Sequence, residues 1–163
     1  MSELNKLHAN VQASIARFGI QCQVHYHAEL PVEIRSPQDF ADALGYPVQR
    51  ITKTLFVHSR EARTFAVAVC SADRRMDFKA MADAMGVRRV EAAALGDLEA
   101  RTGYPPGGVS PLGLAAEIVV VMDSLLLDYP TVLVGGGTAA VEVEISPSDL
   151  VKSSKAIVGI ITK

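Results

Sequence analysis

Thr102-Gly103-Tyr104-Pro105-Pro106-Gly107-Gly108-Val109-Ser110-Pro111-Leu112-Gly113 is a run that holds four glycines and three prolines. Proline fixes φ and lacks a backbone donor, whereas glycine admits positive φ. The run therefore predicts a stiff, open loop rather than a helix or a central strand. Backbone N–H groups in such a loop can bind a small polar group or a developing oxyanion. A tight structural connection is the alternative, which the loop alone does not exclude.

Length and composition predict a single globular domain over residues 1–163. Hydrophobic residues make up 49% of the chain and charged residues 21%, which is typical of a globular protein with one core. Cys22 and Cys70 lie far apart, so we expect neither a disulfide framework nor a cysteine zinc site, and a reducing cytoplasm is favoured. No secretory signal is predicted, and Glu117 and Asp123 interrupt the most apolar stretch, which argues against a membrane span.

Hydrophobic spacing and cap residues predict helices and strands along the whole chain, with no linker between them. Helices are expected at Leu4–Phe18, Ser36–Gly45, Asp77–Met85 and Ala92–Arg101, and after Ser146. Strands are expected at Gln21–His27, Ile51–His58, Thr64–Cys70, Val87–Glu91, Ile118–Met122, Thr131–Val134, Val141–Ile145 and Ala156–Ile160. Hairpins and crossovers occur together in this order, which favours a mixed sheet over a parallel one.

Two further segments accompany the loop. A Lys-Thr-Leu strand precedes it at residues 51–57, and a glycine turn at residues 134–137 leads into the acidic alternating strand Val141–Ile145. In this order the three segments resemble the freestanding aminoacyl-tRNA deacylases of the YbaK type, which are related to the editing domain inserted in bacterial prolyl-tRNA synthetases. The resemblance covers nearly the whole chain. It implies an α+β fold with a mixed, strongly curved sheet of six or seven strands flanked by helices.

Lys53 is the first candidate for a functional side chain. Side chains alternate along a strand, so Lys53 shares a face with Ile51, Leu55 and Val57. A lysine on an apolar face must reach an opening or meet a polar partner. A lysine whose head simply reaches water is the alternative. The resemblance favours a catalytic role, because the lysine of the Lys-Thr-Leu strand is the key active-site residue of the family.

The proline-glycine loop supplies the next candidates. Gly107 and Pro111 match the family's Gly-x-x-x-Pro motif, whose backbone lines the pocket for the aminoacyl group. We expect Gly107, Gly108 and Val109 to direct N–H groups at the ester carbonyl, and we count both glycines as catalytic. Ser110 lacks a Gly-x-Ser-x-Gly elbow and an evident Asp/His pair. We interpret its hydroxyl as part of a turn and not as a nucleophile.

Residues 135–137 predict a hairpin turn beside the pocket, since no Walker lysine follows the glycines. The substrate-binding residues that we infer are His27, Thr54, Val109, Ser110, Pro111, Gly135, Gly136, Gly137 and Glu142. The chain departs from the closest relatives in this region. Gly135 replaces a serine, residues 138–140 replace a basic turn, Glu142 replaces an aspartate, and His27 falls near an active-site tyrosine. These departures leave the amino acid that is removed undecided.

A metal site is an alternative for the first strand. His25, His27 and Glu29 share a face if that strand continues, and this spacing can hold a metal. An exposed polar strand face is the interpretation that we favour, because no second group of ligands is evident. We therefore predict neither a metal nor a cofactor.

Charge is distributed unevenly, although the net charge is only −2. Residues 50–101 contain ten Lys or Arg against seven Asp or Glu, a net of +3, so the remainder carries −2 − 3 = −5. A basic middle segment permits a local phosphate-binding patch. Scattered, solvated charges are an equally good reading of the same numbers. The tRNA-binding candidates are Arg74, Arg75, Arg88 and Arg89.

The resemblance implies an enzyme that acts in trans and hydrolyses the ester of mischarged tRNA. A small amino acid such as cysteine or alanine on tRNA-Pro is the expected substrate, and prolyl-tRNA synthetase is a candidate partner. An aminoacyl ester is already reactive, so positioned water and oxyanion stabilisation suffice. Two other classes stay open: a module that binds tRNA or a nucleotide without hydrolysis and associates with a synthetase, and a metal hydrolase that uses His25 and His27.

Overall fold

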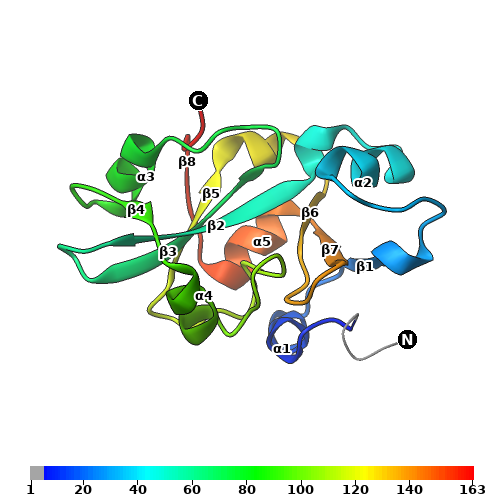
Figure 1. Ribbon diagram of the computed structural model, residues 1–163, viewed down its shortest axis with the longest axis horizontal. Helices are drawn as coiled ribbons and strands as arrows, with labels where there is room; N and C mark the ends of the chain where they lie inside the picture. The colour runs from blue at the N-terminus through cyan, green and yellow to red at the C-terminus, as the bar shows by residue number, and fades with distance from the viewer. Residues whose placement is uncertain (1–5) are drawn as a thin grey trace.

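The computed structural model describes residues 6–163, which form two β-sheets with helices packed around them (Figure 1). The described helices are α1 (Ala9–Phe18), α2 (Pro37–Leu44), α3 (Phe78–Met85), α4 (Leu95–Thr102) and α5 (Pro147–Ser154). The strands are β1 (Gln23–Tyr26), β2 (Thr52–Ser59), β3 (Thr64–Ser71), β4 (Glu91–Ala92), β5 (Val119–Asp123), β6 (Val132–Gly135), β7 (Val141–Ile145) and β8 (Ile157–Gly159). Leu4 of the predicted first helix lies outside the described residues.

Local cap chemistry sets the start of several helices. The Ser36 hydroxyl accepts a hydrogen bond from the Asp39 N–H, and a proline follows at the first helical position of α2. Ser146 and Asp149 repeat this arrangement at α5. Such caps satisfy backbone donors that have no partner within the helix. Both predicted Ser-Pro helix starts are therefore confirmed. No helix within residues 6–163 is long and apolar enough to cross a bilayer.

The two sheets meet along one edge of β2. The larger sheet has the order β4-β2-β3-β5-β8 and mixes antiparallel with parallel pairs, while the smaller has the order β1-β7-β6. At the start of β2, Ile51 bridges Leu133 in parallel and the Thr52 hydroxyl donates to the Leu133 carbonyl. Further along, the same edge pairs with β4 through Val57 and His58.

The mixed α+β class is confirmed, but the prediction of one strongly curved sheet with six or seven strands is not. The described residues form eight strands in two sheets. The cause lies in β2, whose one edge is divided between β6 and β4. The smaller sheet therefore branches from the larger one instead of extending it.

Three groups of apolar side chains form the core. The largest group fills the space between α1, α5 and the two sheets. On the opposite face of the larger sheet, α3 packs through Met81 on Val57. The third group joins Phe40 of α2 to Ile51 and Leu133 at the junction of the sheets. In Figure 1, β2 runs from α2 and β6 towards α3 and β4. Side chains on one face of β2 therefore begin at the group that contains α2, with Ile51, and end at the group that contains α3, with Val57.

Candidate functional site

Lys53 lies where the two sheets meet. It stands two residues after Ile51, whose bridge partner is Leu133. Beyond this bridge β2 and β6 lie close together, and Gly135 is the last residue of β6. Lys53 is partly buried, and its ammonium forms no ion pair or side-chain hydrogen bond within the described part of the chain. The sheet junction thus holds a partly buried cation.

Cys70 of β3 lies opposite Lys53 of β2. Cys70 is the cross-strand partner of Lys53 and is fully buried. Burial raises the pKa of the Cys70 thiol to about 11, and the positive charge of Lys53 acts in the opposite direction. The Lys53 charge therefore acts electrostatically on the Cys70 thiol across the strand pair.

The proline-glycine loop begins with a type II turn over residues 105–108. Gly107 has φ +81°, which is the value that the third residue of such a turn requires. Pro106 occupies the second position, and the Gly108 N–H donates to the Pro105 carbonyl at 3.0 Å. The prediction that Gly108 directs its N–H at a substrate is therefore wrong, because the turn already uses that donor. Gly107 and Val109 keep N–H groups that bind no acceptor among residues 6–163.

Close contact between two loops fixes this segment against the end of β6. A Cβ added at Gly135 would lie 2.2 Å from the Val109 carbonyl oxygen, and one at Gly108 would lie 2.9 Å from the Thr138 carbonyl carbon. Real Cβ atoms do not approach other atoms so closely, so both positions require glycine in this arrangement. The proline-glycine loop and the glycine turn are thereby held together at the end of β6.

Ser110 and Pro111 are buried inside the same loop. The Ser110 hydroxyl is inaccessible to solvent and accepts a hydrogen bond from the Leu112 N–H at 3.1 Å. The Leu112 carbonyl in turn accepts from the hydroxyl of buried Tyr104. This geometry agrees with the interpretation of Ser110 as a turn hydroxyl. It also shows that Pro111 contributes packing behind the loop instead of an exposed surface.

His27 and Glu142 lie on the same side of the smaller sheet. The His27 Nε2 is 2.7 Å from the Glu142 Oε2, and Glu142 is the cross-strand partner of Gly135. The His27 ring lies 5.0 Å from the ring of Phe40. Gly135, Glu142, His27 and the Val109 backbone are thus brought together by β6, β7, the 3-10 turn after β1 and the loop, and β6 lies next to β2, the strand that carries Lys53.

Three other predicted substrate contacts lie less directly on this side. Strand alternation turns the Thr54 side chain to the opposite face of β2, together with the core residue Phe56. Gly136 and Gly137 are buried against α1 and its preceding residues, since a Cβ on Gly137 would lie 2.4 Å from the Cβ of His8. These two glycines shape the turn from behind.

The metal alternative is not supported by the geometry of the first strand. β1 ends at Tyr26, and residues 27–29 form a 3-10 turn, so Glu29 does not continue the strand face. His25 and His27 each pair with a glutamate of β7. No group of three or more potential ligands is assembled within residues 6–163.

A hydrogen-bonded cluster around Glu144 was not predicted from the sequence. The buried Glu144 carboxylate lies 2.8 Å from the His25 Nε2, accepts from the Thr131 hydroxyl at 2.6 Å and accepts from the Tyr46 hydroxyl at 3.0 Å. Arg50 stacks on the Tyr46 ring, 3.7 Å from its centroid, and places Nη2 3.5 Å from the carboxylate. The cluster joins β1, the segment after α2, the 3-10 turn before β2, the residue before β6, and β7.

These donors determine the protonation of Glu144. Burial by itself raises the pKa of the carboxyl group, but hydrogen bonds from Thr131, His25 and Tyr46 outweigh it, so the pKa falls below its usual value. The same contacts, with burial as the largest cause, raise the pKa of the Tyr46 phenol. Glu144 is therefore ionised and fully engaged. The alternating acidic residues of β7 were the sequence signal for it, whereas its partners are scattered over more than 100 positions.

The four arginines predicted to bind tRNA do not form one patch. Arg74 and Arg75 precede α3, and the Arg74 Nε donates to the Thr162 hydroxyl at 2.8 Å. Arg88 and Arg89 follow the helix and are exposed. Because the eight residues of α3 span about 12 Å, the two pairs lie at opposite ends of it.

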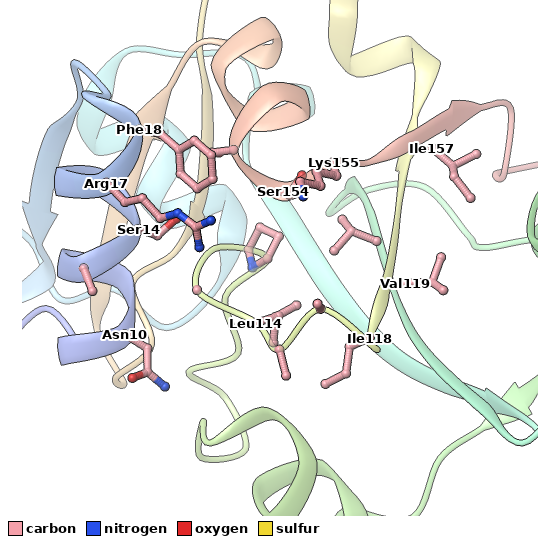
Figure 2. Close-up of a pocket in the computed structure, with 17 residues that line it drawn as sticks. Asn10, Ser14, Arg17, Phe18, Leu114, Ile118, Val119, Ser154, Lys155 and Ile157 are labelled. Atoms are coloured by element: carbon pink, nitrogen blue, oxygen red, sulfur yellow. The ribbon is translucent and has the colours of Figure 1, made fainter.

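A separate cavity lies elsewhere in the molecule. It encloses about 600 Å³ between α1, the loop after Pro111, the end of α5 and β8. Figure 2 shows Arg17, Leu114, Ile118 and Ile157 around it. Pro111 is the one predicted site residue in its wall. The cavity thus lies behind the proline-glycine loop and apart from Lys53, so we do not assign the reacting group to it.

The sequence profile of the family described as the aminoacyl-tRNA editing domain matches residues 32–153. The match contains β2, the proline-glycine loop, the glycine turn and β7. The chain belongs to the aminoacyl-tRNA editing domain family. The resemblance inferred from the three sequence segments is therefore confirmed.

Individual relatives agree with this family. The chain is 33% identical over 112 residues to a protein of Enterococcus faecalis named as a Cys-tRNA(Pro)/Cys-tRNA(Cys) deacylase, EbsC, covering 69% of this chain and 68% of that protein. It is 30% identical to the prolyl-tRNA editing protein ProX of Acetoanaerobium sticklandii, over 67% of this chain and 69% of the relative. The crystal structure of the protein APE2540 superimposes with a TM-score of 0.83 and 30% identity, covering 94% of this chain and 99% of that one.

Proposed function

We propose that this protein is an aminoacyl-tRNA deacylase that acts in trans on mischarged tRNA. The observation that carries the proposal is the junction of the two sheets. There, unpaired Lys53 follows the bridge between Ile51 and Leu133, and Gly135 at the end of β6 contacts the Val109 backbone, in a chain of the aminoacyl-tRNA editing domain family. The family relatives named as a deacylase and a prolyl-tRNA editing protein support the same reaction class.

The proposed chemistry requires little beyond charge placement. Attack of water on the aminoacyl ester moves negative charge onto the carbonyl oxygen, and donors that are already oriented towards this oxygen stabilise the transition state. The Lys53 ammonium is the proposed charged group, and the N–H groups of Gly107 and Val109 are the proposed backbone donors. The collapsing intermediate expels the ribose oxygen, which takes up a proton and leaves as the free tRNA terminus.

The substrate is proposed to be a small amino acid, cysteine or alanine, attached to tRNA-Pro. Gly135 closely approaches the Val109 carbonyl at the end of β6, and the pair formed by His27 and Glu142 lies at the adjacent strand, which favours a small side chain. The Glu142 carboxylate can accept a hydrogen bond from the α-ammonium group that every aminoacyl ester carries. One methylene changes binding by only about 1–3 kcal/mol, so related small amino acids are expected to compete.

The partners and location proposed for the protein follow from this substrate. Charged tRNA is the macromolecular ligand, and prolyl-tRNA synthetase is the proposed associate, because it produces the ester to be cleaved. We place the protein in the cytoplasm, where aminoacylation supplies that ester and where free thiols such as Cys22 and Cys70 stay reduced.

A deacylation panel tests the proposal. Purified protein is mixed with tRNA-Pro that carries cysteine, alanine, serine or proline, and the surviving ester is measured over time. Rapid loss of cysteine or alanine with survival of proline is the expected result. Survival of every ester, in protein that still binds tRNA, would favour a binding module over an enzyme. A chelator is added in a parallel series. Loss of activity in that series would support the alternative of a metal hydrolase that uses His25 and His27.

A further inference from the structure

A second pocket lies between α3 and β4 and encloses about 460 Å³. Phe78, Lys79 and Ala82 of α3 form one wall, and residues 88–92 form the other. Phe78 is 45% exposed although it is a large apolar residue. An exposed aromatic ring beside an apolar hollow is the arrangement on which unstacked bases bind in single-stranded nucleic acid complexes.

Cations surround the mouth of this pocket. Arg88 and Arg89 line both the pocket and a neighbouring hollow that also includes Arg60. Nearby carboxylates engage two of these arginines: Glu91 lies 2.6 Å from the Arg60 Nε, and Glu61 lies 3.9 Å from the Arg88 Nε. The Arg89 guanidinium forms no ion pair with any residue that the structure describes. Arg89 can therefore contact a phosphate without breaking an existing pair.

The pocket shares a sheet face with Lys53. Side chains of Lys53, Leu55 and Val57 alternate onto one side of β2, and Val57 belongs to the same buried group as Met81 of α3. Val57 is also the cross-strand partner of Ala92 in the pocket wall. Four residues of strand span about 13 Å, which corresponds to a few nucleotides of single strand. The pocket wall at Ala92 therefore lies within the reach of a single strand whose terminus is held at Lys53.

We propose that the pocket binds an unstacked base of the single-stranded 3′ acceptor end of tRNA. The Phe78 ring stacks on the base, and Arg89 contacts an adjacent phosphate. The proposal rests on the proposed deacylase function, in which Lys53 holds the terminal aminoacyl group and the pocket holds a nucleotide upstream of it. Stacking tolerates any base, so the pocket sets the position of the acceptor end and not its sequence.

Binding of uncharged tRNA tests this without requiring hydrolysis. Two ligands are compared, intact tRNA-Pro and the same tRNA with its single-stranded 3′ end removed. Phe78→Ala is expected to raise the Kd of intact tRNA about 5- to 150-fold and to leave the Kd of the trimmed tRNA unchanged. Phe78→Tyr, which keeps the ring, is expected to restore binding. Leu127→Ala, at a residue 50% exposed and outside the pocket, serves as the matched control.

Salt dependence gives a second readout that does not depend on Phe78. Arg89→Gln is expected to make the slope of log Kd against log salt concentration shallower by about 0.7 for intact tRNA, the value for one lost phosphate contact on a single strand. Equal weakening of intact and trimmed tRNA by Phe78→Ala, or no weakening of either, overturns the proposal. An unchanged salt slope in Arg89→Gln overturns the phosphate contact. A protein that passes these tests but leaves every mischarged ester intact contradicts the deacylase function and not the pocket.

Discussion

Lys53 and Glu144 are both partly or fully buried charges at the junction of the two sheets, yet the protein treats them in opposite ways. Four side chains surround Glu144, and hydrogen bonds from three of them, Thr131, His25 and Tyr46, lower its pKa. The Lys53 ammonium has no such partner within residues 6–163. A saturated charge holds structural elements in place, because any movement breaks several hydrogen bonds at once. A charge without hydrogen-bond or ion-pair partners is available to interact with a ligand. The comparison separates a residue that builds the junction from one that is proposed to act there.

Replacement of Lys53 gives the largest expected effect on activity. Lys53→Ala is expected to lower kcat for deacylation about 10²- to 10³-fold, the usual cost of losing one transition-state donor, with little change in the free energy of unfolding. Lys53→Arg is expected to fail as well, since the guanidinium is longer and planar. Single-turnover hydrolysis and urea unfolding measure the two quantities. Lys152→Ala, on the surface of α5, is the control, and wild-type hydrolysis by Lys53→Ala would remove the proposed role.

Replacement of Glu144 is expected to show the reverse pattern. Glu144→Gln keeps the size of the side chain but leaves Arg50 without its buried counter-charge, which costs about 3 kcal/mol of the free energy of unfolding. In the fraction that stays folded, kcat is expected to change far less than in Lys53→Ala. Urea titrations compare it with Glu117→Gln, which alters an exposed carboxylate. If Glu144→Gln were stable and inactive, the distinction between the two charges would be wrong.

Ser110→Ala tests the proline-glycine loop. The hydroxyl accepts the buried Leu112 N–H, and an unsatisfied buried donor costs about 1–2 kcal/mol. Turnover is expected to fall by less than about tenfold, which is 1.4 kcal/mol in the barrier. Thermal unfolding and the deacylation assay give both values. A complete loss of activity with normal stability would instead make Ser110 a nucleophile.

The smallest expected effect is a pH dependence that belongs to Glu144. Its folded-state pKa lies below the unfolded value of about 4.3. Its contribution to stability is therefore fully present above that pH and is lost as the pH falls through the folded-state pKa. The difference in unfolding free energy between the wild type and Glu144→Gln should shrink as the pH is lowered from 7 to 3. A difference that stays constant over this range would show that the charge of Glu144 does not stabilise the fold.

Features encoded by neighbouring residues were predictable from the sequence. The two Ser-Pro helix starts depend on atoms within three positions of each other, and both were predicted. The choice of Lys53 as a candidate followed from the alternation of side chains along one strand, which places it on an apolar face. The use of the Gly108 N–H was equally local: proline followed by glycine specifies a type II turn, and that turn bonds the N–H of its fourth residue. Attention to turn type would have corrected that prediction.

Features that depend on distant residues were not predictable in this way. The partners of Glu144 come from positions 25, 46, 50 and 131, and no spacing in one sequence connects them. The division of the β2 edge between β4 and β6 also depends on pairs more than 30 residues apart. The family resemblance supplied the overall class, but the number of sheets required the structure.

The pairing of β1 has a consequence for how the protein forms during synthesis. Among the described strands, β1 pairs only with β7, which lies more than 100 residues later in the chain. Contacts of such high sequence separation form late, because a long loop must close first. While the ribosome is still making residues 30–140, His25 and His27 have no strand beside them, although the β2–β3 hairpin can already form. The nascent chain therefore cannot pair His25 and His27 with β7, and competence for hydrolysis is expected to arise abruptly only after residues 141–145 have been made.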